Sequence, residues 1–268
     1  MKSIGIIAGN GAYPGIFARA ARGAGVEHLA AVAFVGETDP SLEAEVDSLD
    51  WMRVGQLGKM IKFFKGEGIE KAVMTGQISP GNLFELRPDL RTLAMLGKLK
   101  ERNAESIFSA IADEMSKEGI ALIAATTFLD DLLPAPGHVC GPPLATKRQG
   151  DADFGFRIAK EMSRLDIGQT VVVKEGTVLA VEAFEGTNEA LARGGRLGKG
   201  GAAMVKVSKP EQDLRFDVPV VGPVTVEAAA EAGVDLIVVE AGKTLLLERE
   251  KIFALCDKHK VTVVAIHQ

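Results

Sequence analysis

The opening of the chain, residues 3–25, constrains the fold more than any other segment. Ser3–Ala8 (SIGIIA) is a short apolar run that ends at a glycine, which is typical of a buried strand in a parallel sheet. The sequence GNGAYPG follows, and apolar residues then recur at helical spacing up to Gly25. In a strand, glycine-rich turn and helix, the turn's N–H groups and the helix N-terminus favour an anion such as a diphosphate.

This turn matches the dinucleotide-binding fingerprint only in part. Gly9 and Gly11 correspond to its first two glycines, but Pro14 stands where the third would be. Two interpretations stay open. Gly9, Asn10, Gly11 and Pro14 form either a phosphate-binding loop or a tight turn of the kind that any α/β domain contains.

The first half of the chain alternates between strands and helices. We expect strands at 29–35, 71–75 and 120–126, with an amphipathic helix at 56–65. This alternation predicts a mostly parallel sheet with right-handed crossovers. Ligands of such sheets bind past the carboxyl ends of the strands, where two glycine turns would meet. The second of these turns contributes Gly76, Gln77 and Ser79.

The second half has its own mixture of elements. A helix at 149–164 precedes two β-type runs, 169–174 and 177–182, which an EG turn would join into a hairpin. A segment rich in proline and glycine, 133–147, marks the boundary between the halves. The predicted fold is therefore α/β: a Rossmann-like parallel-sheet domain (1–135), followed by a mixed α/β domain (136–268).

A glycine-rich stretch in the second half, 194–201, is predicted to be a flexible loop. It carries Arg196 and Lys199. Such a loop could close on a phosphate group, or it could be a mobile tip without a ligand.

Charged residues gather in the segment 206–222, KVSKPEQDLRFDVPVVG. Asp213 and Asp217 lie four residues apart with Arg215 between them, and Lys206 and Lys209 stand upstream. If residues 214–219 are extended, the three central charges point to one side. Two carboxylates around a cation suit a divalent metal or an oriented water, and the lysines suit phosphate oxygens. The alternative is a solvated edge strand protected by lysine and proline.

Composition excludes several classes of protein. A net charge of −5 argues against a nucleic-acid partner. The four histidines form no zinc pattern, and the two cysteines lie far apart, so we expect them to be reduced. No apolar run reaches the length of a membrane span, and the N-terminal run is too short for a signal peptide. We therefore expect a cytoplasmic protein.

Four stretches, taken in order, resemble the LpxI family of UDP-2,3-diacylglucosamine pyrophosphatases, which act in lipid A synthesis. The stretches are IGIIAGNGAYP, DIGQTVVVKEGTVLAVEAFEGTN, KVSKPEQDLRFDVPVVGPVT and AGKTLLLER. The resemblance spans essentially the whole chain. The second and third stretches are specific, whereas the first alone would not be.

The resemblance implies a reaction on a nucleotide-sugar glycolipid. Water would attack the sugar-side phosphorus of UDP-2,3-diacylglucosamine, with Mg²⁺ or Mn²⁺ present, to give UMP and 2,3-diacylglucosamine 1-phosphate (lipid X). It also implies a homodimer whose two domains both contact the substrate. Because the substrate is amphiphilic, we expect peripheral contact with the inner membrane at most.

The resemblance also assigns roles to residues. The family's DxRxD pattern falls on Asp213, Arg215 and Asp217, and Asp217 would position the metal or the water. The two aspartates are the predicted metal ligands, and Lys206 completes the predicted catalytic set. The family's EGT motif continues with aspartate, whereas this chain has the neutral Asn188. Further substrate contacts are predicted at Thr187, Asn188, Lys199, Lys209 and Thr225.

Two other functions stay open at this point. Asn188 fits a non-catalytic protein that binds a UDP-sugar or lipid X, because a neutral side chain would weaken a metal site. The Gly9-x-Gly11 turn fits an NAD-dependent oxidoreductase, although Pro14 departs from the required pattern.

Overall fold

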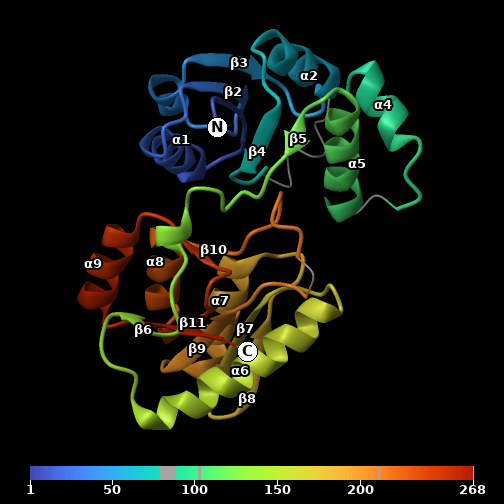
Figure 1. Ribbon diagram of the computed structural model, residues 1–268. Helices are drawn as coiled ribbons and strands as arrows, with labels where there is room; N and C mark the ends of the chain where they lie inside the picture. The colour runs from blue at the N-terminus through green and yellow to red at the C-terminus, as the bar shows by residue number, and fades with distance from the viewer. Residues whose placement is uncertain (79–87, 102–103, 211, 268) are drawn as a thin grey trace. The chain divides into compact units, whose positions relative to one another are not determined.

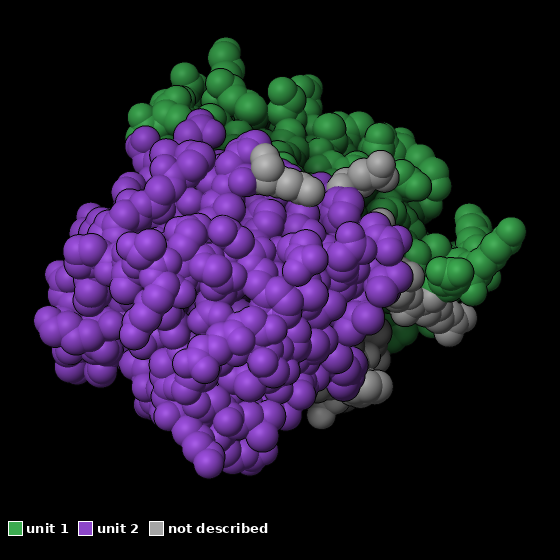
Figure 2. Space-filling view, turned by 90° about the horizontal axis from the view of Figure 1, so that it is seen from below, with its two compact units in different colours: residues 1–129, 213–217 green, residues 130–212, 218–268 purple. Residues whose placement is uncertain are grey.

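The computed structural model describes residues 1–78, 88–101, 104–210 and 212–267 (Figure 1). The chain divides into two compact units, which Figure 2 colours separately. Residues 1–129 form the first unit together with the short segment 213–217, and the remaining residues form the second. The predicted domain boundary at residue 135 stays a prediction.

The first unit is built on a parallel sheet of five strands with the order β3-β2-β1-β4-β5 (Figure 1). The strands are β1 (Ser3–Ala8), β2 (His28–Phe34), β3 (Ser48–Met52), β4 (Lys71–Thr75) and β5 (Ala121–Leu122). β1 and β4 have the predicted bounds. β5 is much shorter than the predicted strand, and β3 was not predicted.

Helices complete the core of this unit. They are α1 (Tyr13–Gly23), α2 (Leu57–Gly66), α4 (Leu90–Leu96) and α5 (Ala104–Lys117), with the 3₁₀-helix η1 (Pro40–Glu45). Buried side chains of α2, α4 and α5 form one cluster with alternate residues of the sheet, among them Ile7, Ala30 and Ala72. The intervening residues, such as Ile6 and Val73, are also fully buried. Burial on both faces explains why these strands read as continuous apolar runs.

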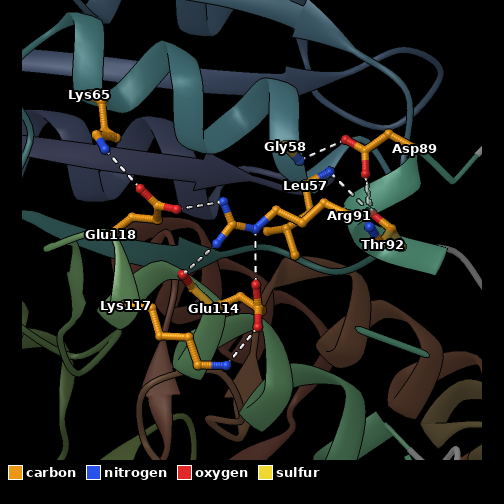
Figure 3. A network of polar contacts seen from close by, with 9 residues as sticks. All are labelled: Leu57, Gly58, Lys65, Asp89, Arg91, Thr92, Glu114, Lys117 and Glu118. Atoms are coloured by element: carbon orange, nitrogen blue, oxygen red, sulfur yellow. Dashed lines mark hydrogen bonds and ion pairs between the residues drawn. The ribbon is translucent and has the colours of Figure 1, made fainter. Parts of the chain in front are cut away.

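Polar contacts attach α4 to its neighbours (Figure 3). Asp89 caps the helix by accepting a hydrogen bond from the Thr92 amide at 2.8 Å, and it also accepts one from the Gly58 amide at 2.6 Å. Arg91 pairs with two carboxylates of α5 and the turn after it, Glu114 at 2.9 Å and Glu118 at 2.8 Å. These contacts tie α4 to the start of α2 and to the end of α5.

The second unit contains a mixed sheet of six strands with the order β6-β13-β11-β9-β7-β8. The strands are β6 (Gly137–Cys140), β7 (Thr170–Lys174), β8 (Thr177–Val181), β9 (Ala202–Lys206), β11 (Val234–Glu240) and β13 (Thr262–Ile266). β7 and β8 form the predicted antiparallel hairpin, and Glu175 and Gly176 both adopt positive φ in its turn. A separate parallel pair consists of β10 (Val220–Val221) and β12 (Leu245–Leu246).

Four helices bury the two faces of this sheet. α6 (Thr146–Arg164) covers one face, and α7 (Thr187–Gly198), α8 (Pro223–Glu231) and α9 (Arg249–His259) cover the other. The 3₁₀-helix η2 (Asp130–Leu132) precedes β6. Both cysteines are reduced and buried in the cluster on the α9 side.

The prediction of a flexible loop at 194–201 is wrong for its first half. Gly194, Gly195 and Gly198 lie in α7. A Cβ atom on Gly194 would stand 2.6 Å from Val172 of β7, and one on Gly195 would stand 1.9 Å from the Ala232 carbonyl oxygen. These glycines therefore permit close helix packing, and a local reading of the sequence mistook that role for flexibility.

The predicted α/β class is confirmed, with a parallel sheet in the first unit and a mixed sheet in the second. Within the described ranges, no helix combines the length and the apolar character that a membrane crossing requires.

We predict that Gly9→Ala destabilises the first unit by about 1–3 kcal/mol, because the added Cβ would stand 2.5 Å from the Gln77 carbonyl oxygen. Urea unfolding followed by fluorescence of the single tryptophan, Trp51 of β3, measures this unit directly. Gly23→Ala in α1 is the matched control, since nothing lies within 4 Å of its added Cβ. Equal midpoints for the two variants would contradict the assigned role of Gly9.

Candidate active site

The order of the first sheet defines a switch point between β1 and β4. From β1 the chain continues outward to β2 and β3, and it then crosses back to β4 on the other side of β1. In open α/β sheets, ligands bind outside the carboxyl ends of the strands at this point. Here those ends lead into the two glycine turns, 9–11 and 76–77.

The two turns pack backbone against backbone. The Gly9 amide donates to the Thr75 carbonyl at 2.7 Å, and the Asn10 amide donates to the Gln77 carbonyl at 2.8 Å. A Cβ atom on Gly76 would stand 2.5 Å from the Asn10 carbonyl oxygen, and φ of Gly76 is +79°. The prediction that the two turns share one edge of the sheet is confirmed. Ser79 lies outside the described residues.

The start of α1 lies directly after the first turn. Its N-cap residue, Ala12, offers no side-chain hydrogen bond, and Pro14 occupies the first turn of the helix with its side chain buried. Gly11 is exposed, with φ of +81° and nothing near its Cβ position. Uncapped N–H groups at a helix N-terminus suit a phosphate group. Pro14 shapes this helix start.

The segment 213–217 is a turn, so the extended conformation that would point its three charges to one side is not present. The amides of Phe216 and Asp217 both donate to the Asp213 carbonyl, at 3.2 and 3.1 Å. The Asp213 carboxylate also accepts from the Arg215 amide at 3.0 Å. An aspartate that bonds to the backbone two residues later favours a turn over a strand.

Asp213 and Arg215 form a local ion pair. Arg215 Nε and Nη2 donate to the Asp213 carboxylate at distances between 2.6 and 3.0 Å. Hydrogen bonds from the Arg215 side chain, together with its amide and its charge, lower the pKa of Asp213, although partial burial opposes them. Asp213 is therefore a carboxylate at neutral pH, and both of its oxygens are engaged by Arg215.

The turn is fastened to the first unit through Ala125, which follows β5. The Ala125 amide donates to the Leu214 carbonyl at 2.7 Å. Its carbonyl accepts a hydrogen bond of the same length from the hydroxyl of Tyr13, the first residue of α1. Phe216 also stacks on Phe108 of α5, with ring centroids 5.6 Å apart. One residue thus connects the start of α1, beside the first glycine turn, to the turn that carries the two aspartates.

The residues present fit a preformed metal site only in part. Within the described part of the chain, no three His, Cys, Asp or Glu side chains converge on a common point. Asp213 does not fit as a ligand while it is paired with Arg215. Mg²⁺ is often held by one or two carboxylates plus substrate phosphate oxygens. The prediction that Asp217 is a metal ligand stays a prediction.

A second group of predicted residues lies in the second unit. Lys206, at the end of β9, is 8% exposed, and its ammonium donates to the Thr187 hydroxyl at 3.2 Å. That hydroxyl donates to Glu182 Oε1 at 2.7 Å. The other oxygen of Glu182 is buried without a hydrogen-bond partner among the described residues, as is Gln169 Oε1. A buried cation beside unsatisfied oxygens indicates a polar site at the N-terminus of α7.

The remaining predicted residues of this unit are distributed around it. Asn188 is exposed in the first turn of α7 and lines an open groove of about 660 Å³ between α7 and α8. Lys199 caps the C-terminal end of α7, away from Lys206 and Thr187 at the other end. Lys209 forms an ion pair with Asp166, and Thr225 lies in the first turn of α8. The structure thus brings Lys206 and Thr187 together and leaves Lys199 apart from them.

A buried ion cluster anchors the chain just after Lys206. Glu240, which is 2% exposed, accepts hydrogen bonds from the Ser208 amide at 2.8 Å and from Lys160 at 3.1 Å, and it pairs with Lys243 at 2.9 Å. Burial opposes ionisation of Glu240, but these partners outweigh it and lower the pKa. The cluster fixes the backbone that leaves β9.

Sequence reasoning missed three residues that support these sites: Tyr13, Ala125 and Glu182. Tyr13 and Ala125 act through contacts distant in the sequence, which no local pattern reveals. Glu182 directly follows β8, and that position is the signal that could have found it.

Comparison with known proteins gives consistent matches over both halves of the chain. Residues 3–132 match the LpxI N-terminal domain, and residues 135–264 match the LpxI C-terminal domain. The chain is 33% identical to a protein of Caulobacter vibrioides named UDP-2,3-diacylglucosamine pyrophosphatase LpxI. That alignment covers 99% of this chain and 98% of the relative.

We predict that Asp213→Asn lowers the urea midpoint of the first unit at pH 7 and that the difference disappears in acid. The pKa of Asp213 is lowered in the folded state. Its contribution to stability is therefore present above the unfolded value of about 3.9 and is lost as the pH falls through the folded value. Trp51 fluorescence at pH 7, 4 and 2.5 measures it. A difference that stays constant over this range would show that the ion pair does not contribute.

Proposed function

Because the chain belongs to the LpxI family, we propose that it hydrolyses the diphosphate of UDP-2,3-diacylglucosamine in lipid A biosynthesis. The products are UMP and 2,3-diacylglucosamine 1-phosphate. The observation that carries the proposal, beside the family matches over both halves, is the pair of Ala125 hydrogen bonds. These bonds connect Tyr13, which follows the first glycine turn, to Leu214 in the turn with the two aspartates. Both turns lie in the first unit.

The reaction requires charge stabilisation and an oriented water. Water forms a bond to the sugar-side phosphorus, the bond from that phosphorus to the bridging oxygen breaks, and UMP leaves with the bridging oxygen. The backbone N–H groups of Gly11 and of the first turn of α1 hold phosphate oxygens. Asp217 orients the water, and Arg215, kept in place by Asp213, supplies positive charge.

The second unit, taken by itself, contains a polar site that suits an anionic group. The Lys206 ammonium, directed by the Thr187 hydroxyl and Glu182, binds an anionic oxygen. Asn188 at the start of α7 donates through its amide. Because this side chain is neutral, it suits a hydrogen bond to the substrate better than coordination of a metal ion.

A divalent cation, Mg²⁺ or Mn²⁺, belongs to the proposal. Asp217 would hold it together with substrate oxygens, since both oxygens of Asp213 are engaged by Arg215. When bound, it supplies positive charge that offsets the charge of the phosphoryl oxygens. We also propose that the protein is a homodimer and that it meets its lipid substrate as a peripheral protein.

One alternative is a protein that binds the same class of ligand but does not hydrolyse it. Asn188 stands where the family pattern has aspartate, and this favours a protein that binds a UDP-sugar or lipid X without turnover. The NAD-dependent oxidoreductase has no comparable support, because the buried Pro14 replaces the third glycine.

We predict that Asp217→Ala and Asp217→Asn reduce the rate of UMP release by about 10²–10³-fold, as expected when a group that acts in the transition state is removed. Chromatographic assay of UMP, with Mg²⁺ and with excess EDTA, measures the rate and its dependence on metal. Asp257→Asn, an exposed aspartate on α9, is the control and should retain full activity.

The unmodified chain decides between the two functions. Binding of the substrate without release of UMP in Mg²⁺ or Mn²⁺ would contradict hydrolysis and favour the binding protein. Unchanged activity of both Asp217 variants would contradict the role given to that residue.

A further inference from the structure

A third turn meets the glycine turns at the switch point, and the reaction proposed above does not use it. It follows β2, where the amides of Glu37 and Thr38 both donate to the Phe34 carbonyl at 3.0 Å. The Thr38 hydroxyl accepts from the Phe34 amide at 2.8 Å and donates to the Ala8 carbonyl at 2.5 Å. The turn is thereby fixed against the end of β1.

Glu37 of this turn contacts the first glycine turn through its side chain. Asn10 Nδ2 donates to Glu37 Oε2 at 3.1 Å, across 27 residues of sequence. Glu37 is only 9% exposed, so its carboxylate lies in the wall beside the turn. The backbone of Asn10 is held in turn by its bridge to Gln77. Residues that follow three neighbouring strands, β2, β1 and β4, therefore meet at one place.

The chemistry of this arrangement favours a ribose. A carboxylate accepts hydrogen bonds from two neighbouring hydroxyl groups, and a ribose presents such a pair at its 2′ and 3′ positions. In doubly wound sheets, the phosphate lies at the first helix N-terminus while an acidic residue past the second strand accepts from the ribose. The start of α1 and Glu37 stand in these two positions of the fold.

We propose that Glu37, oriented by Asn10, accepts hydrogen bonds from the ribose hydroxyls of the uridine nucleotide and so selects ribonucleotides over deoxynucleotides. This inference rests on the proposed function, because it takes the UMP half of the substrate as the ligand. Glu37 is a specificity residue that acts on the part of the substrate away from the reacting phosphorus.

Calorimetric titration with UMP and with 2′,3′-dideoxy-UMP tests the proposal. The wild type should bind UMP on the order of 10–100-fold more tightly, the range expected for hydrogen bonds to a charged acceptor. Glu37→Gln should reduce this ratio to about 3-fold or less and leave the affinity for dideoxy-UMP unchanged. Asn10→Ala, which removes the orienting amide, should also reduce the ratio.

Glu67→Gln is the matched control. Glu67 accepts from the Ser48 hydroxyl at 2.8 Å and contacts His28, at the opposite, amino-terminal end of β2 and β3. It should keep the wild-type ratio.

Several outcomes would overturn the proposal. If the wild type binds UMP and dideoxy-UMP with nearly equal affinity, the proposal is wrong. This result needs no variant, so it decides the question even if Glu37→Gln fails to fold. Equal weakening of both ligands in Glu37→Gln would mean that Glu37 only supports the fold. Release of UMP from the full substrate is measured on the same preparation. If UMP is released but UMP and dideoxy-UMP bind equally, only the role proposed for Glu37 is contradicted. If UMP binds more tightly but none is released from the substrate, only the proposed reaction is contradicted.

Discussion

The two hydrogen bonds of Ala125 hold the candidate active site together. Its amide binds the Leu214 carbonyl and its carbonyl binds the Tyr13 hydroxyl, each at 2.7 Å. Buried polar groups are costly when unpaired, so each bond penalises any movement of its partner. Burial also raises the pKa of Tyr13, which keeps its hydroxyl a donor. These bonds place a turn from late in the sequence in the first unit, beside the residues that start α1.

The predicted site residues Asp213 and Lys206 lie in different units and have different surroundings. The Asp213 carboxylate accepts hydrogen bonds from the side chain and the amide of Arg215. It therefore stabilises the turn and holds the Arg215 guanidinium in place. Asp217 follows at the end of the same turn. In the second unit, Lys206 is buried and directed by Thr187, and the Glu240 cluster holds the chain that follows it. Residues 206–212 belong to the second unit, whereas 213–217 belong to the first.

The elements whose signals are local could be predicted from the sequence. β1 and β4 have the predicted bounds, because an apolar run that ends at a glycine depends on nearby residues alone. The meeting of Gly9 and Gly76 also followed from the rule that parallel strands end at one edge. The hydrogen bonds within the turn at 213–217 are local, but its attachment to Ala125 and Phe108 could not be predicted, because these residues are distant in the sequence. The glycines of α7 were interpreted as a flexible loop, because the atoms that leave no room for a Cβ belong to Val172 and Ala232, which are distant in the sequence.

Hydrogen exchange of the peptide 213–217 tests the central claim most directly, namely that this turn is part of the first unit. Val73→Ala in β4 and Val238→Ala in β11 each remove buried volume from one unit, since both valines are fully buried. The account predicts that Val73→Ala accelerates exchange of 213–217 together with peptides of β1 and β4, while Val238→Ala leaves it unchanged. Exchange that responds to Val238→Ala and ignores Val73→Ala would contradict it.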